Sequence, residues 1–130
     1  MHGSKKNLPT TLNAKEVVFQ EIEWGDIHVA FEAYHEPLDI RPFFEGLPDR
    51  RCQCPHWGYV VKGRMKIEYA DREEIVEAGE VYYISPGHVP VMQPGTEIVE
   101  FSPTDDYRKT SEVVQRNFEA MHGSSEAPAS

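Results

Sequence analysis

The sequence predicts an all-β protein, an antiparallel and jelly-roll-like β-barrel followed by one C-terminal α-helix. Three observations lead to this prediction. Short runs of β-branched and aromatic residues recur at nearly regular spacing from residue 17 to residue 101. Gly, Pro and Asp residues separate these runs, as turns between strands require. The segment from residue 104 to residue 121 instead repeats its apolar residues at helical spacing.

The first two strands form a predicted hairpin. Val17–Trp24 and Ile27–Tyr34 are both rich in β-branched and aromatic residues, and a Gly-Asp pair between them suits a tight turn. Side chains alternate along the second run, so His28 and Glu32 share one face. We interpret these two residues as a surface pair rather than as part of a site.

Short strands continue through the middle of the chain. Met65 and Ile67 alternate with Arg64 and Lys66, which is typical of a strand with one buried face. Pro-Gly pairs interrupt the pattern twice. The spacing favours a barrel or a sandwich over a parallel sheet with helices. We expect strands at residues 59–62, 64–69, 73–77, 81–84, 89–92 and 96–101.

The C-terminal segment, residues 104–121, is predicted to be an amphipathic helix. Thr104 is placed to cap its first turn, and Asp105 and Asp106 suit the positive end of the helix dipole. We expect a docking helix without a chemical role. One apolar face should pack against the barrel, formed by Tyr107, Val114, Phe118 and Met121.

Composition indicates one globular domain. The chain has 130 residues, of which 39% are hydrophobic and 27% charged. We place the domain at residues 14–121 and expect flexible tails at 1–10 and 123–130, which are polar. We find neither a run long enough to span a bilayer nor an apolar leader, and we therefore expect a cytoplasmic protein. The net charge of −9 argues against nucleic acid or an anionic membrane as a partner.

Two segments with glycine turns carry a family resemblance. They read Tyr59-Val-Val-Lys-Gly63 and Gly79-Glu-Val-Tyr-Tyr-Ile-Ser-Pro-Gly87. The first resembles the end of the first conserved motif of the cupin superfamily, and the second resembles the start of the second motif. This resemblance implies a small antiparallel barrel, often with a metal at its centre and a small-molecule ligand. Dimers are common among the proteins that it resembles, so we expect a homodimer.

The sequence departs from both cupin motifs at the usual metal ligands. Counting back from the glycine that ends the first motif, His56 stands where the family has glutamate. Cys52 lies near the second histidine position, and Arg50 takes the first. In the second motif, Pro90 occupies the histidine position and His88 lies two residues earlier. The family's usual set of histidines and glutamate is therefore missing.

A different set of donors lies in the same region. Cys52, Cys54 and His56 alternate, so an extended segment would direct all three to one face. His88 follows a Pro-Gly turn and can reach the same point. Two thiolates and two imidazoles suit one divalent transition metal, zinc or ferrous iron. The alternative is that no metal binds, the cysteines fill the core and the histidines belong to a pocket or a turn.

The two cysteines are predicted to be reduced thiols. A disulfide between residues this close on a strand would close a small, strained loop. Two functional interpretations remain open. In one, the protein is a metal-dependent oxygenase, isomerase or lyase for a small organic molecule, with Tyr59 or Tyr83 as a proton donor. In the other, it is a non-catalytic module that binds a ligand or only forms dimers.

Two further features bear on the ligand. Several aromatic residues are candidates for the wall of a cavity in the barrel, although we expect most of them to belong to its core, namely Trp57, Tyr59, Tyr69, Tyr83 and Phe101. The segment at residues 41–47 is strongly apolar but lies outside any clear strand. We interpret it either as a flap over the barrel mouth or as a loop packed across the barrel end or into a dimer partner, and we favour the second interpretation.

Overall fold

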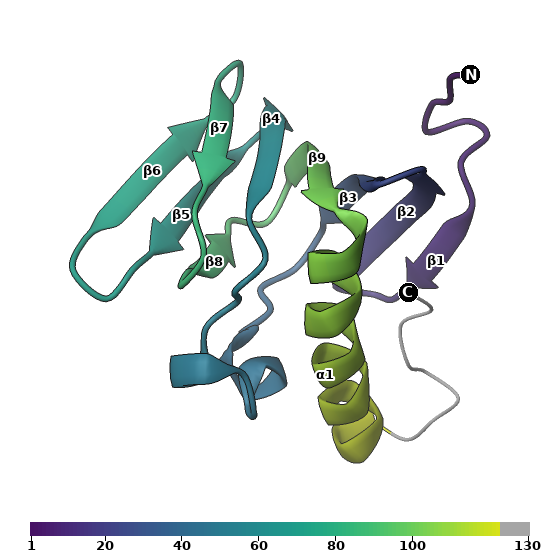
Figure 1. Ribbon diagram of the computed structural model, residues 1–130. Coiled ribbons are helices and arrows are strands. Elements are labelled where there is room, and N and C mark those ends of the chain that lie inside the picture. The colour runs from purple at the N-terminus through teal and green to yellow at the C-terminus, as the bar shows by residue number, and fades with distance from the viewer. Residues whose placement is uncertain (123–130) are drawn as a thin grey trace.

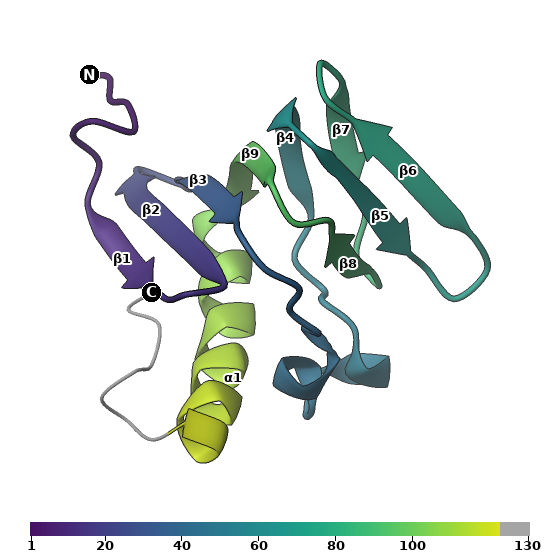
Figure 2. The same cartoon turned by 180° about the vertical axis from the view of Figure 1, so that it is seen from behind.

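The computed structural model describes residues 1–122, which form two antiparallel β-sheets and one long C-terminal helix (Figure 1 and Figure 2). The tail predicted at residues 123–130 lies outside the described residues. Within the described residues, no helix is long and apolar enough to cross a membrane. The mostly-β architecture with one C-terminal helix is confirmed.

The larger sheet has six strands in the order β1-β2-β3-β9-β4-β7. These strands are β1 (Thr10–Asn13), β2 (Val17–Trp24), β3 (Ile27–Tyr34), β9 (Thr96–Pro103), β4 (His56–Lys62) and β7 (Val81–Ile84). The smaller sheet has the order β6-β5-β8. Its strands are β6 (Glu73–Glu77), β5 (Arg64–Glu68) and β8 (Val89–Met92). Every neighbouring pair is antiparallel.

One apolar core joins the two sheets. Val60 and Ile98 from the larger sheet pack in the same cluster as Met65 and Ile67 from the smaller one, and all four side chains are almost fully buried. Burial of a side chain of this size contributes about 1.5–3 kcal/mol. The sheets therefore face each other as a jelly-roll sandwich, which is the form that the predicted barrel takes.

The N-terminal part of the chain extends the larger sheet further than expected. Residues 10–13 form the edge strand β1, which has a register shift in its pairing with β2. Before it, Leu8 is buried, and Lys5 forms an ion pair with Glu97 of β9. This segment lacks the alternation of apolar and polar residues that signals a strand, which explains why the sequence did not indicate it. The domain limits at 14 and 121 stay a prediction.

The helix α1 (Thr104–His122) runs along one side of the sandwich (Figure 1). Tyr107 stacks on His28 of β3, with ring centroids 3.5 Å apart. Phe118 packs against Phe43 at 5.8 Å. Three of the four predicted contact residues thus face the protein, with Val114 packed on a second apolar cluster. The prediction for Met121 is wrong, because its side chain is 55% exposed near the helix end.

The apolar segment before β4 forms two short 3-10 helices, η1 (Arg41–Phe44) and η2 (Pro48–Arg50). Phe43 and Phe44 are buried. The side-chain amide of Asn117 on α1 donates to the backbone carbonyls of Phe43 and Glu45, at 2.7 Å in both cases. The segment therefore packs beside the helix and closes one end of the sandwich (Figure 2).

Of the five aromatic residues predicted as candidates for a cavity wall, four lie on the outer surface and the fifth lies in the core. Trp57, Tyr59, Tyr83 and Phe101 are exposed on the outer face of β4, β7 and β9. The reason is the alternation of a β-strand, which turns residue 56 inward and residue 57 outward. Tyr69 is buried, in the core between the sheets.

Candidate metal and ligand site

A cavity of about 150 Å³ lies between the two sheets, η1 and α1. Its walls are mostly apolar and aromatic, and its polar groups come from β3, the segment before β4, β4, β9, the turn before β8 and α1. The expectation that α1 docks without a chemical role stays a prediction. Apolar wall residues include Phe19, Phe43, Phe44, Ile84, Met92 and Val114.

A backbone bridge brings two candidate ligands together from distant parts of the sequence. Cys52 and His88 form an antiparallel pair outside the named strands. The Cys52 N–H donates to the His88 carbonyl at 2.9 Å, and the Gly87 N–H donates to the Cys52 carbonyl at 2.8 Å. Gly87 has a φ of +93°, a conformation that glycine adopts without strain. The Pro-Gly turn thus sets where the His88 side chain begins.

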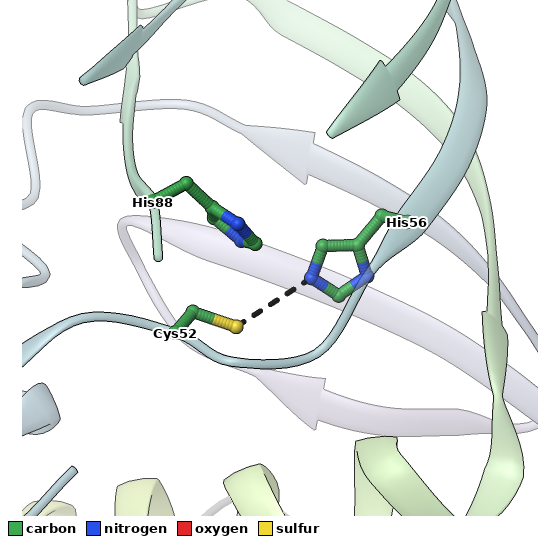
Figure 3. A group of neighbouring side chains, drawn as sticks. All are labelled: Cys52, His56 and His88. Atoms are coloured by element: carbon green, nitrogen blue, oxygen red, sulfur yellow. Dashed lines mark hydrogen bonds between the residues drawn. The ribbon is translucent and has the colours of Figure 1, made fainter. Parts of the chain in front are cut away.

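Cys52, His56 and His88 form a compact group of possible metal ligands. The sulfur and one ring nitrogen from each histidine all lie within 4.8 Å of one another, and all three residues are buried. Figure 3 shows the three side chains directed toward a common point, with Cys52 Sγ 3.6 Å from Nε2 of His56. His56 faces the interior, as strand alternation predicts, and its ring centroid lies 5.1 Å from that of His88.

Hydrogen bonds on the outer side orient both imidazoles. Nδ1 of His88 lies 2.7 Å from the carbonyl of Ser85, and because a carbonyl only accepts, Nδ1 carries the proton and Nε2 is bare. Nδ1 of His56 lies 2.6 Å from Oγ of Ser102 and 3.6 Å from the Glu100 carboxyl. Outer partners of this kind fix the tautomer and orientation of metal-binding histidines.

Burial sets the protonation states of the three groups. It lowers the pKa of His56 to about 3, with a further effect from His28, and it lowers that of His88 to about 4, with a further effect from His56. Both imidazoles are therefore neutral near pH 7, which is the form that binds metals. Burial also raises the pKa of Cys52 to about 12. A metal must therefore displace the thiol proton when it binds.

These three donors fit a divalent transition metal. One thiolate and two neutral imidazoles match the ligand types of zinc, and a site with three protein ligands would leave one coordination position for water or substrate. Ferrous iron also accepts imidazole and thiolate ligands. The three donors are of the types predicted from the sequence, and the metal itself stays a prediction.

Cys54 is not part of this group of three. It is buried, but its thiol points to the carbonyl of Pro55 at 3.4 Å and lies 4.0 Å from Nδ1 of His56, on the side away from Cys52. Strand β4 begins only at His56, so residues before Pro55 do not follow regular strand alternation. Both cysteines are free thiols.

Tyr59 and Tyr83 also lie apart from the group. They stand on the outer face of the larger sheet, opposite the face that carries His56. Other tyrosines that the sequence analysis did not select lie inside. Tyr34 on β3 and Tyr107 on α1 line the cavity.

Two buried carboxyls complete the polar part of the cavity. Glu32 accepts a hydrogen bond from Tyr34 at 2.5 Å, and Glu100 accepts one from Tyr82 at 2.8 Å. Burial raises the pKa of Glu32 well above its usual value, with a further effect from Glu100. Burial likewise raises the pKa of Glu100 to about 7.

The interpretation of His28 and Glu32 as a surface pair is wrong. Both are buried, and Nε2 of His28 lies 3.1 Å from Glu21 instead. The face of β3 that carries Val29 and Phe31 looks more apolar in the sequence, which suggested the opposite assignment. Ala30 and Tyr34 lie on the same face as Glu32, and their presence could have indicated that this face is buried.

Comparisons with solved structures support the cupin fold. The RmlC-like cupin from Shewanella frigidimarina has a TM-score of 0.52 at 14% identity, over 78% of this chain and 88% of that one. KdgF from Halomonas sp. has a TM-score of 0.50 at 13% identity, over 77% and 92%. AerE from Microcystis aeruginosa has a TM-score of 0.53 at 9% identity, over 72% and 44%. No family model and no curated protein sequence matches the chain. The chain therefore has the fold of the cupin superfamily.

Proposed function

We propose that this protein is a small-molecule-binding cupin whose cavity holds a divalent zinc or iron ion on Cys52, His56 and His88. One observation carries the proposal: a ring nitrogen of each neutral imidazole and the Cys52 sulfur lie close together at the cavity wall. The Nδ1 atom of each ring is held by a hydrogen-bond partner, Ser102 for His56 and Ser85 for His88. A cofactor of this kind would polarise a substrate oxygen or activate a bound water.

The chain's own residues have distinct roles in this site. The Ser85 carbonyl and the Ser102 hydroxyl hold the two rings in place. The Glu100 carboxyl lies 3.6 Å from Nδ1 of His56, on the same side of the ring as Ser102 and beyond hydrogen-bond distance. The apolar walls limit access of water to the cavity. These features suit an oxygenase, isomerase or lyase, the classes that the sequence analysis favoured for a metal-containing cupin.

A metal-free ligand-binding module is the second candidate, and one observation favours it. The protonated Cys52 thiol lies 3.6 Å from Nε2 of His56 and can donate to it, so this pair is satisfied without an ion. In that case the cavity binds its ligand through apolar contacts and hydrogen bonds alone.

Metal content separates the two candidates. Protein purified without added metal, then loaded with zinc and desalted, should retain about one ion per chain by elemental analysis. His56→Ala, His88→Ala and Cys52→Ser should each lose most of it, whereas His35→Ala, at an exposed position, should not. Wild-type protein without metal after loading, or variants that keep full occupancy, would remove the metal from the proposal.

We also propose that the chain forms a homodimer through the outer face of β4, β7 and β9. Trp57 pairs directly with Tyr83 on one side and Phe101 on the other, so their exposed rings form a continuous patch. β7 is also an edge strand of the larger sheet. Exposed aromatic patches on a sheet commonly mark interfaces. In a dimer with two-fold symmetry, the same patch of both subunits forms the interface. We therefore propose a second copy of this chain as the partner.

A further inference from the structure

Two buried acids stand out among the polar groups of the cavity. Glu32 and Glu100 both line it and are 6% and 8% exposed. Among the described residues, no lysine or arginine lines the cavity. The remaining polar groups there are hydroxyls, one thiol and neutral imidazoles.

Neither carboxyl has a strong cationic partner inside the protein. Glu32 accepts a hydrogen bond from the hydroxyl of Tyr34, Glu100 accepts one from Tyr82, and the two carboxyls also hydrogen-bond to each other, which requires a proton on one of them. The nearby His28 is paired with a different carboxyl, that of Glu21. Without a positive partner these buried acids hold their protons, because burial raises the pKa of both, and a bound cation would stabilise their ionised form.

The rest of the cavity is shaped for an apolar body. Phenylalanine side chains from β2, η1 and α1 form its walls, namely Phe19, Phe43, Phe44 and Phe118. An apolar cavity of about 150 Å³ is large enough for a ring the size of benzene. Aromatic walls are also favourable surroundings for an ammonium group.

We propose that the ligand of this cavity is a small organic amine, bound as an ammonium ion by Glu32 and Glu100, with a ring-sized apolar body against the phenylalanines. The inference rests on the proposed function of the cavity as a ligand site and adds the class of ligand. In the metal-free cavity a carboxylate or phosphate would meet two acids and no cation, so these ligand classes are excluded there. A neutral molecule of the same shape would offer the carboxyls no charge-assisted hydrogen bond.

Three probes of nearly equal size test this inference on the full chain. Calorimetric titrations with benzylamine, benzyl alcohol and benzoate should rank the amine first. We expect an advantage of about tenfold or more in affinity over the alcohol, because a charge-assisted hydrogen bond is about twice as strong as a neutral one. Equal binding of amine and alcohol, a preference for benzoate, or no binding of any probe would overturn the inference.

Glu32→Gln provides the matched test of the carboxyl. It should lower the affinity for benzylamine about tenfold while changing that for benzyl alcohol by less than about twofold. Glu97→Gln is the control, because Glu97 lies on β9 like Glu100 but faces outward, where it pairs with lysines. If Glu32→Gln does not fold, the ranking of the three probes on wild-type protein decides. An unchanged amine affinity in a folded Glu32→Gln variant would contradict the assignment.

Each titration is made on chelator-treated and on zinc-loaded protein. Amine selectivity in a protein that retains no zinc would support the ligand class and reject the metal centre. Zinc retention without amine selectivity would support the metal centre and reject the ligand class. The two proposals therefore fail separately.

Discussion

Binding of a soft divalent metal should release one proton from the Cys52 thiol. Burial raises the pKa of this thiol to about 12. Because pH 8 lies about four units below this pKa, removal of the thiol proton costs about 5 kcal/mol of free energy. The two histidines, with pKa values of about 3 and 4, have no proton to lose at the bare nitrogen. The apparent affinity should therefore rise about tenfold for each pH unit below the thiol pKa.

Cadmium is a suitable probe, because its thiolate bond absorbs in the ultraviolet and its bound water keeps its protons at this pH. Calorimetry in two buffers of different ionisation enthalpy counts the protons. We expect one proton and one thiolate band per chain. Cys54→Ser is the control and should leave both unchanged, whereas Cys52→Ser should abolish both. Two protons with a band halved by Cys54→Ser, or no proton and no band, would refute the three-ligand account.

Three further predictions follow from the rest of the fold. Trp57→Asp should convert a dimer to a monomer in light scattering, whereas Ile75→Asp, at an exposed site on β6, should not; a wild-type monomer would contradict the proposed interface. Gly63→Ala should destabilise the protein by more than about 2 kcal/mol in urea unfolding, because φ is +83° and a Cβ would lie 2.6 Å from Thr96. Gly79→Ala, with a φ of +90° and open space, should cost only about 1 kcal/mol, and equal losses would argue against the clash. Because the pKa of Glu100 is raised to about 7, its stability contribution is present at low pH and is lost as the pH rises through that value. Unfolding measured between about pH 4.5 and 7 should show most of this loss in wild type and less of it in Glu100→Gln, because the loss begins near the unfolded pKa and is nearly complete above the folded one.

The fold was largely predictable because its signals are local. The hairpin of β2 and β3 matches its predicted limits, and alternation in β5 correctly separates the buried Met65 and Ile67 from their more accessible neighbours. Residues 10–13 form a strand because they pair with β2, which no local pattern indicates. Met121 has the spacing of the apolar face of the helix, but its side chain is exposed instead of packing against the sandwich.

The site was predictable only in part, for a physical reason. Alternation in β4 places His56 inside, and the Pro-Gly turn indicates His88, but the bridge between Cys52 and His88 depends on tertiary packing. The same alternation, applied to Tyr59 and Tyr83, places them outside. The buried carboxyls were missed because a glutamate on a strand is usually solvated, and only the closing of the sandwich shows otherwise.

X-ray absorption at the zinc edge of the zinc-loaded protein tests the central claim most directly. The account predicts one sulfur at about 2.3 Å and two imidazole nitrogens at about 2.0–2.1 Å, with one lighter ligand in the open position. Loss of the sulfur shell in Cys52→Ser, but not in Cys54→Ser, would identify the thiol. A shell of oxygen atoms alone, or of two sulfurs, would contradict a metal centre built from Cys52, His56 and His88.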